Sequence, residues 1–339
     1  MTLYALENLD DAIDATKAFL WPIERTRWIK LALVVFFIGA PGVNSTTFQY
    51  NIPADQAPAG GFPMPPDIGP RVWLLVAVII AAVLLLGILF LLVGSIMEFV
   101  LIESLRHEEV TVRRYWNRRW RQGVRLFGFR LVIGLLVLGS VVVIAALFLL
   151  PVVVETGPAN AAPTDGFSIV PFLLLVPALL ILAILVGLIN GFTTVFVVPV
   201  MIVQDCGVLG GWRRLWPTIT ANPWQYLAYA VGGVILSIAG GILIAILAGI
   251  AMLVLLIPFG ILGAIGFGLL MTVQPLGIGV LTIVGLLFVL SVLLVVALAQ
   301  VPVVTYLRYY ALLILGDIDG DLDLIPERRA AVRTEEEST

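Results

Sequence analysis

The stretch from Arg106 to Arg130 constrains the fold of this chain most strongly, because it places eight arginines between two long apolar runs. Arginine is costly at the centre of a bilayer, and short basic loops stay on the cytoplasmic side of a membrane. The stretch therefore predicts an inner loop with a membrane span on either side of it. The composition agrees, since 12% of the residues are charged, compared with about 25% in soluble domains.

The remaining apolar runs predict an all-α polytopic membrane protein with six transmembrane helices in three out-and-back hairpins. Interfacial elbow helices are expected on the inner side at 106–130 and 207–224, and outer loops at 41–71 and 154–169. Five of the expected spans cover about residues 28–39, 72–102, 131–153, 170–203 and 276–304, and the remaining one begins near residue 226.

Residues 258–275 are apolar, glycine-rich and uncharged, and they could form a seventh span. With six spans, 18 of the 19 Lys and Arg residues lie on the inner side or at its boundary, and only Arg71 lies outside. A seventh span would move Arg308 and the C-terminal arginines outward, against the positive-inside rule. We therefore expect a re-entrant or outer-leaflet hairpin at 258–275, with both termini in the cytoplasm.

The two ends of the 21–315 membrane domain carry different charged segments. Residues 1–20 predict an amphipathic helix, whose acidic face could pack on the arginine-rich elbow or lie in solvent at the membrane interface. Residues 316–339 predict an acidic and partly disordered cytoplasmic tail. Its alternating aspartates, from Asp317 to Asp323, do not match a calcium loop, because Gly320 is misplaced.

Enzyme chemistry finds no support in the sequence. The chain has one histidine and one cysteine, His107 and Cys206, which argues against a clustered His/Cys metal site and an internal disulfide framework. The motifs for a phosphate loop, a zinc helix and a nucleophile elbow are absent. We therefore expect no enzyme activity, no catalytic residue, no cofactor, no metal and no nucleic-acid partner.

Three sets of residues are candidates for contacts. Arginines and tryptophans of the elbows are expected to bind anionic lipid headgroups: Arg113, Arg114, Trp116, Arg118, Trp120, Arg121, Arg213, Arg214 and Trp216. Small residues at four-residue steps are expected to permit close helix packing, within the chain or in a homo-oligomer: Gly233, Ser237, Gly241, Ala245 and Gly249. Among the intramembrane polar residues, Glu98, Glu103 and Asp205 are expected to lock helix orientation, with a proton path as the alternative. The deeper Asn190, Thr193 and Thr194 are expected to form interhelical hydrogen bonds.

Three segments resemble an uncharacterised family of integral membrane proteins from halophilic archaea. They are FVVPVMIVQDCGVLGGWRRLWPTITANPWQYLAY, RQGVRLFGFRL and YLRYYALLILGDIDGDLDLIPERRAAVR. The hairpins and elbows are more distantly similar to the membrane domain attached to some bacterial glycerophosphodiester phosphodiesterases. The catalytic domain of those enzymes is absent, so the resemblance implies a membrane fold and no phosphodiesterase activity.

These observations favour a non-enzymatic scaffold or accessory protein of the archaeal cell membrane, acting through lateral helix and lipid contacts. Its expected partners are anionic lipids and either a second copy or another membrane protein. The alternative is a transporter of a neutral or amphipathic solute, with its site near Asn190, Thr193 and Pro199.

Overall fold

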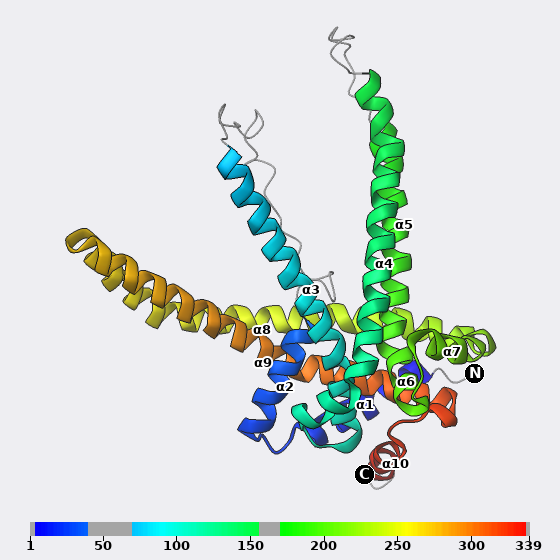
Figure 1. The fold of residues 1–339 in the computed structure, drawn as a ribbon. Helices are drawn as coiled ribbons and strands as arrows, with labels where there is room; N and C mark the ends of the chain where they lie inside the picture. Colours follow the sequence, from blue (N-terminus) through cyan, green and yellow to red (C-terminus); the bar gives the residue numbers. More distant parts are fainter. Residues whose placement is uncertain (1–3, 40–69, 156–169, 337–339) are drawn as a thin grey trace.

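The computed structural model describes residues 4–39, 70–155 and 170–336, and all regular structure in these ranges is helical (Figure 1). Both predicted outer loops lie almost wholly outside the described residues. The elements are α1 (Tyr4–Leu20), α2 (Arg25–Ile38), α3 (Pro70–His107), α4 (Val112–Glu155), α5 (Val170–Phe192), the π-helix η2 (Thr193–Val197), α6 (Val198–Gln204), α7 (Val208–Ala221), α8 (Pro223–Thr272), α9 (Gln274–Ile318), the 3₁₀ turn η3 (Gly320–Leu322) and α10 (Pro326–Glu336).

Five of the described helical segments are long and apolar enough to cross a membrane. They confirm the prediction of an all-α protein with several membrane-type helices. The first predicted span is the exception, because α2 has 14 residues and at 1.5 Å per residue reaches only about 21 Å. A sixth crossing therefore remains a prediction.

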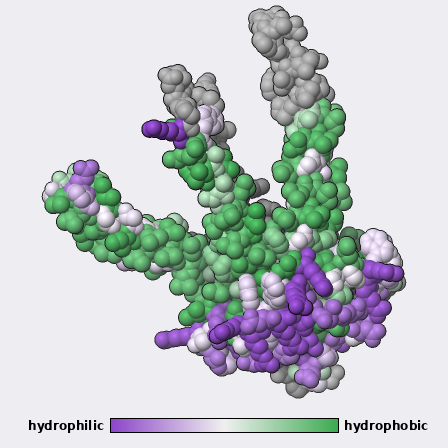
Figure 2. Space-filling model, in the orientation of Figure 1, coloured by the Kyte–Doolittle hydropathy of each residue, from purple (hydrophilic) through white to green (hydrophobic). Residues whose placement is uncertain are grey.

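The long helices form three apolar arms that leave a common base in different directions (Figure 1). The arms are the outer part of α3, the α4–α5 hairpin and the α8–α9 hairpin. Figure 2 shows polar residues gathered at the base and apolar residues along the arms. Every residue from Arg71 to Leu89 on α3 is exposed, so this arm packs against no other described element along that length.

The packed core lies where the inner ends of the arms meet. Its largest fully buried side chains include Phe99 of α3, Phe196 of η2 and Tyr309 of α9. Helix α2 packs on both α3 and α9, and Leu31 and Val35 are fully buried. The base is therefore a small, tightly packed unit from which three apolar arms extend.

The two inner elbows differ in form. Residues 106–130 do not make a separate interfacial helix, because α3 ends at His107 and α4 runs unbroken from Val112 into the following membrane segment. Residues 207–224 do contain a separate helix, α7, which ends before the turn at Asn222. Pro223 then opens α8, a position where proline is favoured because its missing N–H has no helical partner.

Residues 258–272 form the last turns of α8, and the chain reverses at Val273. The reversal falls inside the predicted segment 258–275, and its re-entrant or outer-leaflet position stays a prediction. A continuous helix satisfies its backbone groups internally, which an apolar environment requires. Pro258 is accommodated inside the helix.

The first and last described helices, α1 and α10, pack against each other. Helix α1 contacts α9, α8 and α10, and its acidic Asp11 pairs with Arg333 of α10 at 3.2 Å. Asp11 thus pairs with the C-terminal helix, whereas Glu7 and Asp10 are exposed. The prediction that placed the acidic face on the arginine-rich elbow is corrected. Within the predicted acidic and partly disordered tail, residues 326–336 are helical.

Candidate functional site

Five polar residues meet where α3, α4, η2 and α9 converge, and we call them the Glu98 cluster: Ser95, Glu98, Arg130, Thr194 and Arg308. Glu98 is fully buried. Its Oε1 lies 3.3 Å from Arg130 Nη2, and its Oε2 lies 2.5 Å from Arg308 Nη2. Both carboxylate oxygens are therefore occupied, by guanidinium groups from two different arms.

The π-helix supplies the other acceptors of this cluster. Pro199 has no N–H, and the Val198 N–H donates to the carbonyl of Thr193 rather than to that of Thr194. Thr194 O is thereby left without a helical donor, and Arg308 Nη1 donates to it at 3.1 Å. The Thr194 hydroxyl accepts from Arg130 at 2.8 Å. A proline and one widened turn thus create the site that holds both arginines.

Helices α3 and α4 come very close beside this cluster. A Cβ added at Gly123 of α4 would lie 2.8 Å from the Ile96 Cα of α3, a distance that only glycine tolerates. Ile96 directly follows Ser95 and lies two residues before Glu98 on α3, so the close approach brings α4 next to them. Arg130 Nη1 donates to the Ser95 hydroxyl at 3.3 Å.

A second group, the Glu103 cluster, ties α3 and α4 to the end of α6. It comprises Glu103, His107, Arg119, Gln122 and Asp205. Arg119 pairs with the fully buried Glu103 at 2.6 Å, and His107 Nε2 lies 3.2 Å from the other carboxylate oxygen. Gln122 donates to Asp205 at 2.6 Å and to the carbonyl of Met201 at 3.0 Å.

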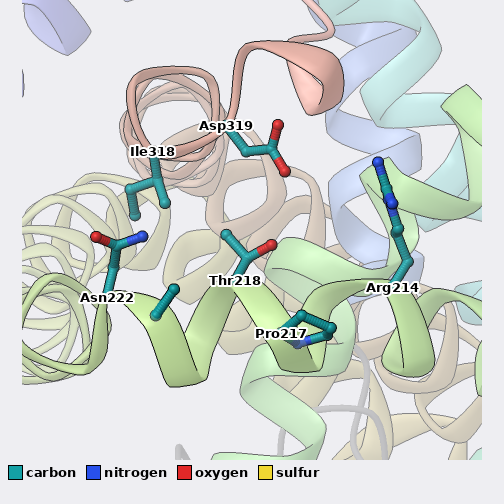
Figure 3. A pocket seen from close by; sticks show the side chains of 7 residues that line it. Arg214, Pro217, Thr218, Asn222, Ile318 and Asp319 are labelled. Atoms are coloured by element: carbon teal, nitrogen blue, oxygen red, sulfur yellow. The ribbon is translucent and has the colours of Figure 1, made fainter.

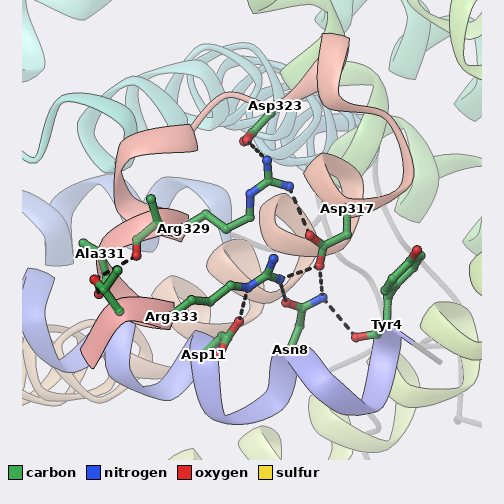
Figure 4. Close-up of polar contacts among 10 residues, drawn as sticks. Tyr4, Asn8, Asp11, Asp317, Asp323, Arg329, Ala331 and Arg333 are labelled. Carbon is green, nitrogen blue, oxygen red and sulfur yellow. Dashed lines mark hydrogen bonds and ion pairs between the residues drawn. The ribbon is translucent and has the colours of Figure 1, made fainter. Parts of the chain in front are cut away.

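A third polar group joins the two ends of the chain, as Figure 4 shows. Arg333 of α10 donates to Asp11 and Asn8 of α1 and to Asp317 of α9. The hydrogen bond that Arg333 donates to Asp317 raises the pKa of the Arg333 guanidinium above its ordinary value. Arg329 bridges Asp317 at 3.1 Å and Asp323 at 2.6 Å. The aspartates expected in a solvated tail therefore hold the C-terminal helix in place.

These buried charges connect helices of different arms at the base. Removing charges from water costs free energy, which mutual attraction recovers only with good geometry and additional hydrogen bonds. Two arginines for one carboxylate give the Glu98 cluster a surplus positive charge, which the Thr194 and Ser95 oxygens help to offset. Among the residues that the structure describes, no three His, Cys, Asp or Glu side chains come together as metal ligands would.

The elbow arginines divide into two classes. Arg113, Arg114, Arg118 and Arg121 are exposed, whereas Arg119 and Arg130 are 7% exposed and committed to ion pairs. On the other elbow Arg213 and Arg214 are exposed. The tryptophans differ as well: Trp120 and Trp216 are 51% and 60% exposed, while Trp116 packs partly against the core.

A shallow groove of about 350 Å³ lies beside Arg214, between α7 and the end of α9 (Figure 3). Thr218 and Asn222 contribute from α7 and its end, and Ile318 and Asp319 from the end of α9. Arg214 also lies 3.8 Å from Asp321, and both side chains are at least half exposed. This ion pair is therefore weak and open to competition from solvent.

The predicted packing residues of α8 do not face α9. A Cβ added at Gly241 or Gly249 would meet no atom within 4 Å, whereas one added at Gly240 would overlap Val303 of α9. Ser237, Ala245 and Gly249 are exposed, and Gly233 and Gly241 are half-buried. The hairpin packs through the neighbouring helical row, so most of the small-residue row is left uncovered by described residues.

The deeper polar residues of α5 and η2 are engaged within the protein. The Thr193 hydroxyl donates to the carbonyl of Ile189 at 2.6 Å and accepts from Trp212 Nε1 at 3.0 Å. The Thr194 hydroxyl donates to the carbonyl of Asn190 at 2.8 Å. The Asn190 side chain is half-buried.

A family profile matches residues 3–325, nearly the whole chain. The chain belongs to this family. It is described as a family of unknown function (DUF7544). No curated protein matches the chain, and no solved structure matches it.

In this DUF7544 chain, the fold brings together predicted residues that are distant in sequence. Glu98 and Thr194 share Arg130, and Glu103 and Asp205 are linked through Arg119. Sequence reasoning did not identify which arginines would pair with them. One signal was available for Arg308, which is the only charged residue between Arg214 and Asp317.

Proposed function

We propose that this chain is a non-enzymatic scaffold of the cell membrane, with six spans and both termini in the cytoplasm, that binds other helices and lipids laterally. The uncovered small-residue row on α8 is the observation that carries the proposal. It stands on an arm held at one end by the packed base, so its position is fixed relative to the rest of the molecule.

A second copy of the chain is the proposed partner of this row. Small side chains let two helix backbones approach closely, which gains van der Waals contact that lipid cannot match. Gly241 and Gly249 have open space above their Cα atoms. Ala245 between them and Ser237 one step before them are exposed. The internal-packing role weighed for the row is met by Gly240 and its neighbours instead.

Anionic lipids are the proposed second class of partner. Each basic residue near an anionic surface contributes roughly 1 kcal/mol of attraction. Arg113, Arg114, Arg118 and Arg121 are exposed and Arg213 and Arg214 likewise, while exposed Trp120 and Trp216 have the amphipathic character of residues at headgroup depth. These residues would hold the base against the inner leaflet.

The proposal includes an origin in a halophilic archaeon and a distant relationship to the membrane domain of glycerophosphodiester phosphodiesterases. The preference for arginine supports the former, because only Lys17 and Lys30 among the 19 basic residues are lysines. A transporter of a neutral solute is the weaker proposal, since the Thr193 and Thr194 hydroxyls are already engaged in internal hydrogen bonds.

Self-association in vesicles tests the scaffold. The protein would be labelled with one fluorophore per chain, and its dimer fraction would be counted by single-molecule photobleaching as protein is diluted in lipid. Gly241→Leu should lower the dimer affinity at least tenfold, because the leucine holds the second helix away. Gly139→Leu on α4 is the matched control, since an added Cβ there also meets nothing within 4 Å.

A wild-type protein that stays monomeric at every dilution would refute the scaffold. Equal effects of Gly241→Leu and Gly139→Leu would refute the assignment of the row. For the transporter, a cysteine at Asn190 in a Cys206→Ser background should react with a water-soluble thiol reagent, and protection of that cysteine would exclude it.

A further inference from the structure

The α8–α9 arm is far longer than the hydrocarbon core of a bilayer. On α9 the uncharged stretch Gln274–Leu307 has 34 residues, or about 51 Å at 1.5 Å per residue. On α8 all 50 residues from Pro223 to Thr272 are uncharged, about 75 Å in all. The hydrocarbon core measures about 30 Å.

The other two arms fit the bilayer. Lengths are compared outward from the Glu98 cluster, to which α3, α4, η2 and α9 all contribute. The uncharged stretch of α3, residues 72–97, has 26 residues, that of α4, residues 131–154, has 24, and the helical run that leads to Thr194, residues 170–193, also has 24. These stretches measure about 39 Å and 36 Å, which cross a 30 Å core at tilts within the usual range of roughly 0–40°. The mismatch is therefore specific to the α8–α9 arm.

Close contacts along its length make this arm a single two-helix rod. A Cβ added at Gly277 would overlap the backbone of Leu270, beside the turn at Val273. Further along, Gly266 lies against Leu281, and Gly240 lies against Val303. Glycines thus interlock the two helices at the tip, in the middle and near the base, and the arm cannot shorten by folding back on itself.

The surface of the rod is apolar on all sides. Leu253 and Ile257 of α8 are 68% and 67% exposed, and Ile283 and Leu286 of α9 are 61% and 60% exposed. A helix pair that is apolar all round requires an apolar environment over its whole length. Lipid acyl chains meet this requirement, whereas one docked protein would cover one side.

We infer that the α8–α9 arm lies in the bilayer at about 55° or more from the membrane normal, with its tip displaced sideways from the base. This is the tilt at which a rod of about 51 Å fits a core of about 30 Å. In Figure 1 the arm likewise diverges widely from α4–α5. The tilt follows from length and apolarity, and it does not depend on self-association.

Depth measurements along the arm test this inference. Spin labels would be placed one at a time on cysteines replacing Ile238, Leu253 or Met271, in a Cys206→Ser background. These side chains are 59%, 68% and 70% exposed, so labels there should not disturb packing. Immersion depth would be read from collisions with oxygen and a water-soluble nickel chelate, in phosphatidylcholine–phosphatidylglycerol vesicles diluted until the protein is monomeric.

The expected gradient along α8 is about 0.9 Å of depth per residue or less, given the 1.5 Å rise. The Leu253 label should then lie near the bilayer centre, and the Met271 label no further out than the opposite headgroup layer. Labels at Val132, Val142 and Leu147 of α4 provide the upright control, with about 1.2–1.5 Å per residue.

An α8 gradient as steep as that of α4, with the Met271 label in water, would overturn the inference. Equal depths for all three α8 labels would support it, because they correspond to an arm lying in the membrane plane. Monomeric vesicles keep this outcome separate from the dimer assay, so either proposal can fail while the other stands.

Discussion

Replacing Glu98 with glutamine removes the one carboxylate that faces both Arg130 and Arg308. The amide keeps the size of the side chain, but it has one acceptor oxygen in place of two, so its NH₂ group faces one of the two guanidinium groups. Glu98 is fully buried, and breaking a buried ion pair by removing one partner costs about 3–5 kcal/mol. We therefore expect Glu98→Gln to lower the free energy of unfolding by about that amount.

The magnitude corresponds to roughly two to three and a half orders of magnitude in the folding equilibrium constant. Reversible unfolding by SDS in mixed micelles, followed by tryptophan fluorescence, would measure it. Glu7→Gln is the matched control, because Glu7 is exposed on α1 and such surface changes fall within about 0.5 kcal/mol.

A double-mutant cycle separates charge imbalance from lost packing. Arg308→Met removes the surplus positive charge, so the pair Glu98→Gln with Arg308→Met should cost less than the sum of the single changes, by about 0.5–3 kcal/mol. If the effects are additive, or if Glu98→Gln is as stable as Glu7→Gln, the ion pairs of the Glu98 cluster do not hold the helices of the base together.

Three further predictions concern other contacts of the base. Gly123→Ala should lower the free energy of unfolding by about 1–3 kcal/mol, because the added methyl group overlaps Ile96. Gly128→Ala is the control and should not lower it, because an added Cβ there meets nothing within 4 Å. Equal values for the two variants in the same unfolding assay would refute the close approach of α3 and α4. Arg333→Gln should release α10 from α1 and speed its cleavage by trypsin after Arg328 or Arg329, and an unchanged cleavage rate would show that the contact is unimportant. Burial raises the pKa of the Cys206 thiol above its ordinary value, so less of the thiol is ionised at neutral pH. The reaction of Cys206 with maleimide should therefore be slower than that of an exposed cysteine, and it should accelerate as the pH rises. A rate equal to that of free cysteine would contradict this prediction.

The sequence predicts the helical class well because long uncharged runs leave few alternatives in an apolar environment. Whether such a run is one helix or two is harder to predict. Pro258 and the glycines around it suggested a break, yet neighbouring α9 supports a continuous α8. The packing of α10 could not be predicted for a related reason. The aspartates before this helix look solvated in isolation, and only folding brings Asp317 and Asp323 against Arg329.

In the Glu98 and Glu103 clusters, the sequence predicts the carboxylates but not the residues that pair with them. Glu98 and Glu103 are recognisable because buried carboxylates are rare in apolar helices. Their partners are not recognisable, because nothing in the local sequence distinguishes the arginines that pair from the other arginines between Arg106 and Arg130. Helix rotation turns Arg119 and Arg130 inward and leaves Arg118 and Arg121 exposed, and the π-turn before Pro199 fixes the acceptors. These features depend on tertiary packing.

The central claim is that the charged base lies on the cytoplasmic side and the arms extend from it into the membrane. Cys206, the only cysteine of the chain, lies in the base between α6 and α7 and reports its side directly. Intact cells would be treated at mildly alkaline pH with a maleimide that cannot cross membranes, before and after permeabilisation. The account predicts labelling of Cys206 only after permeabilisation; labelling in sealed cells would place the base outside and contradict it.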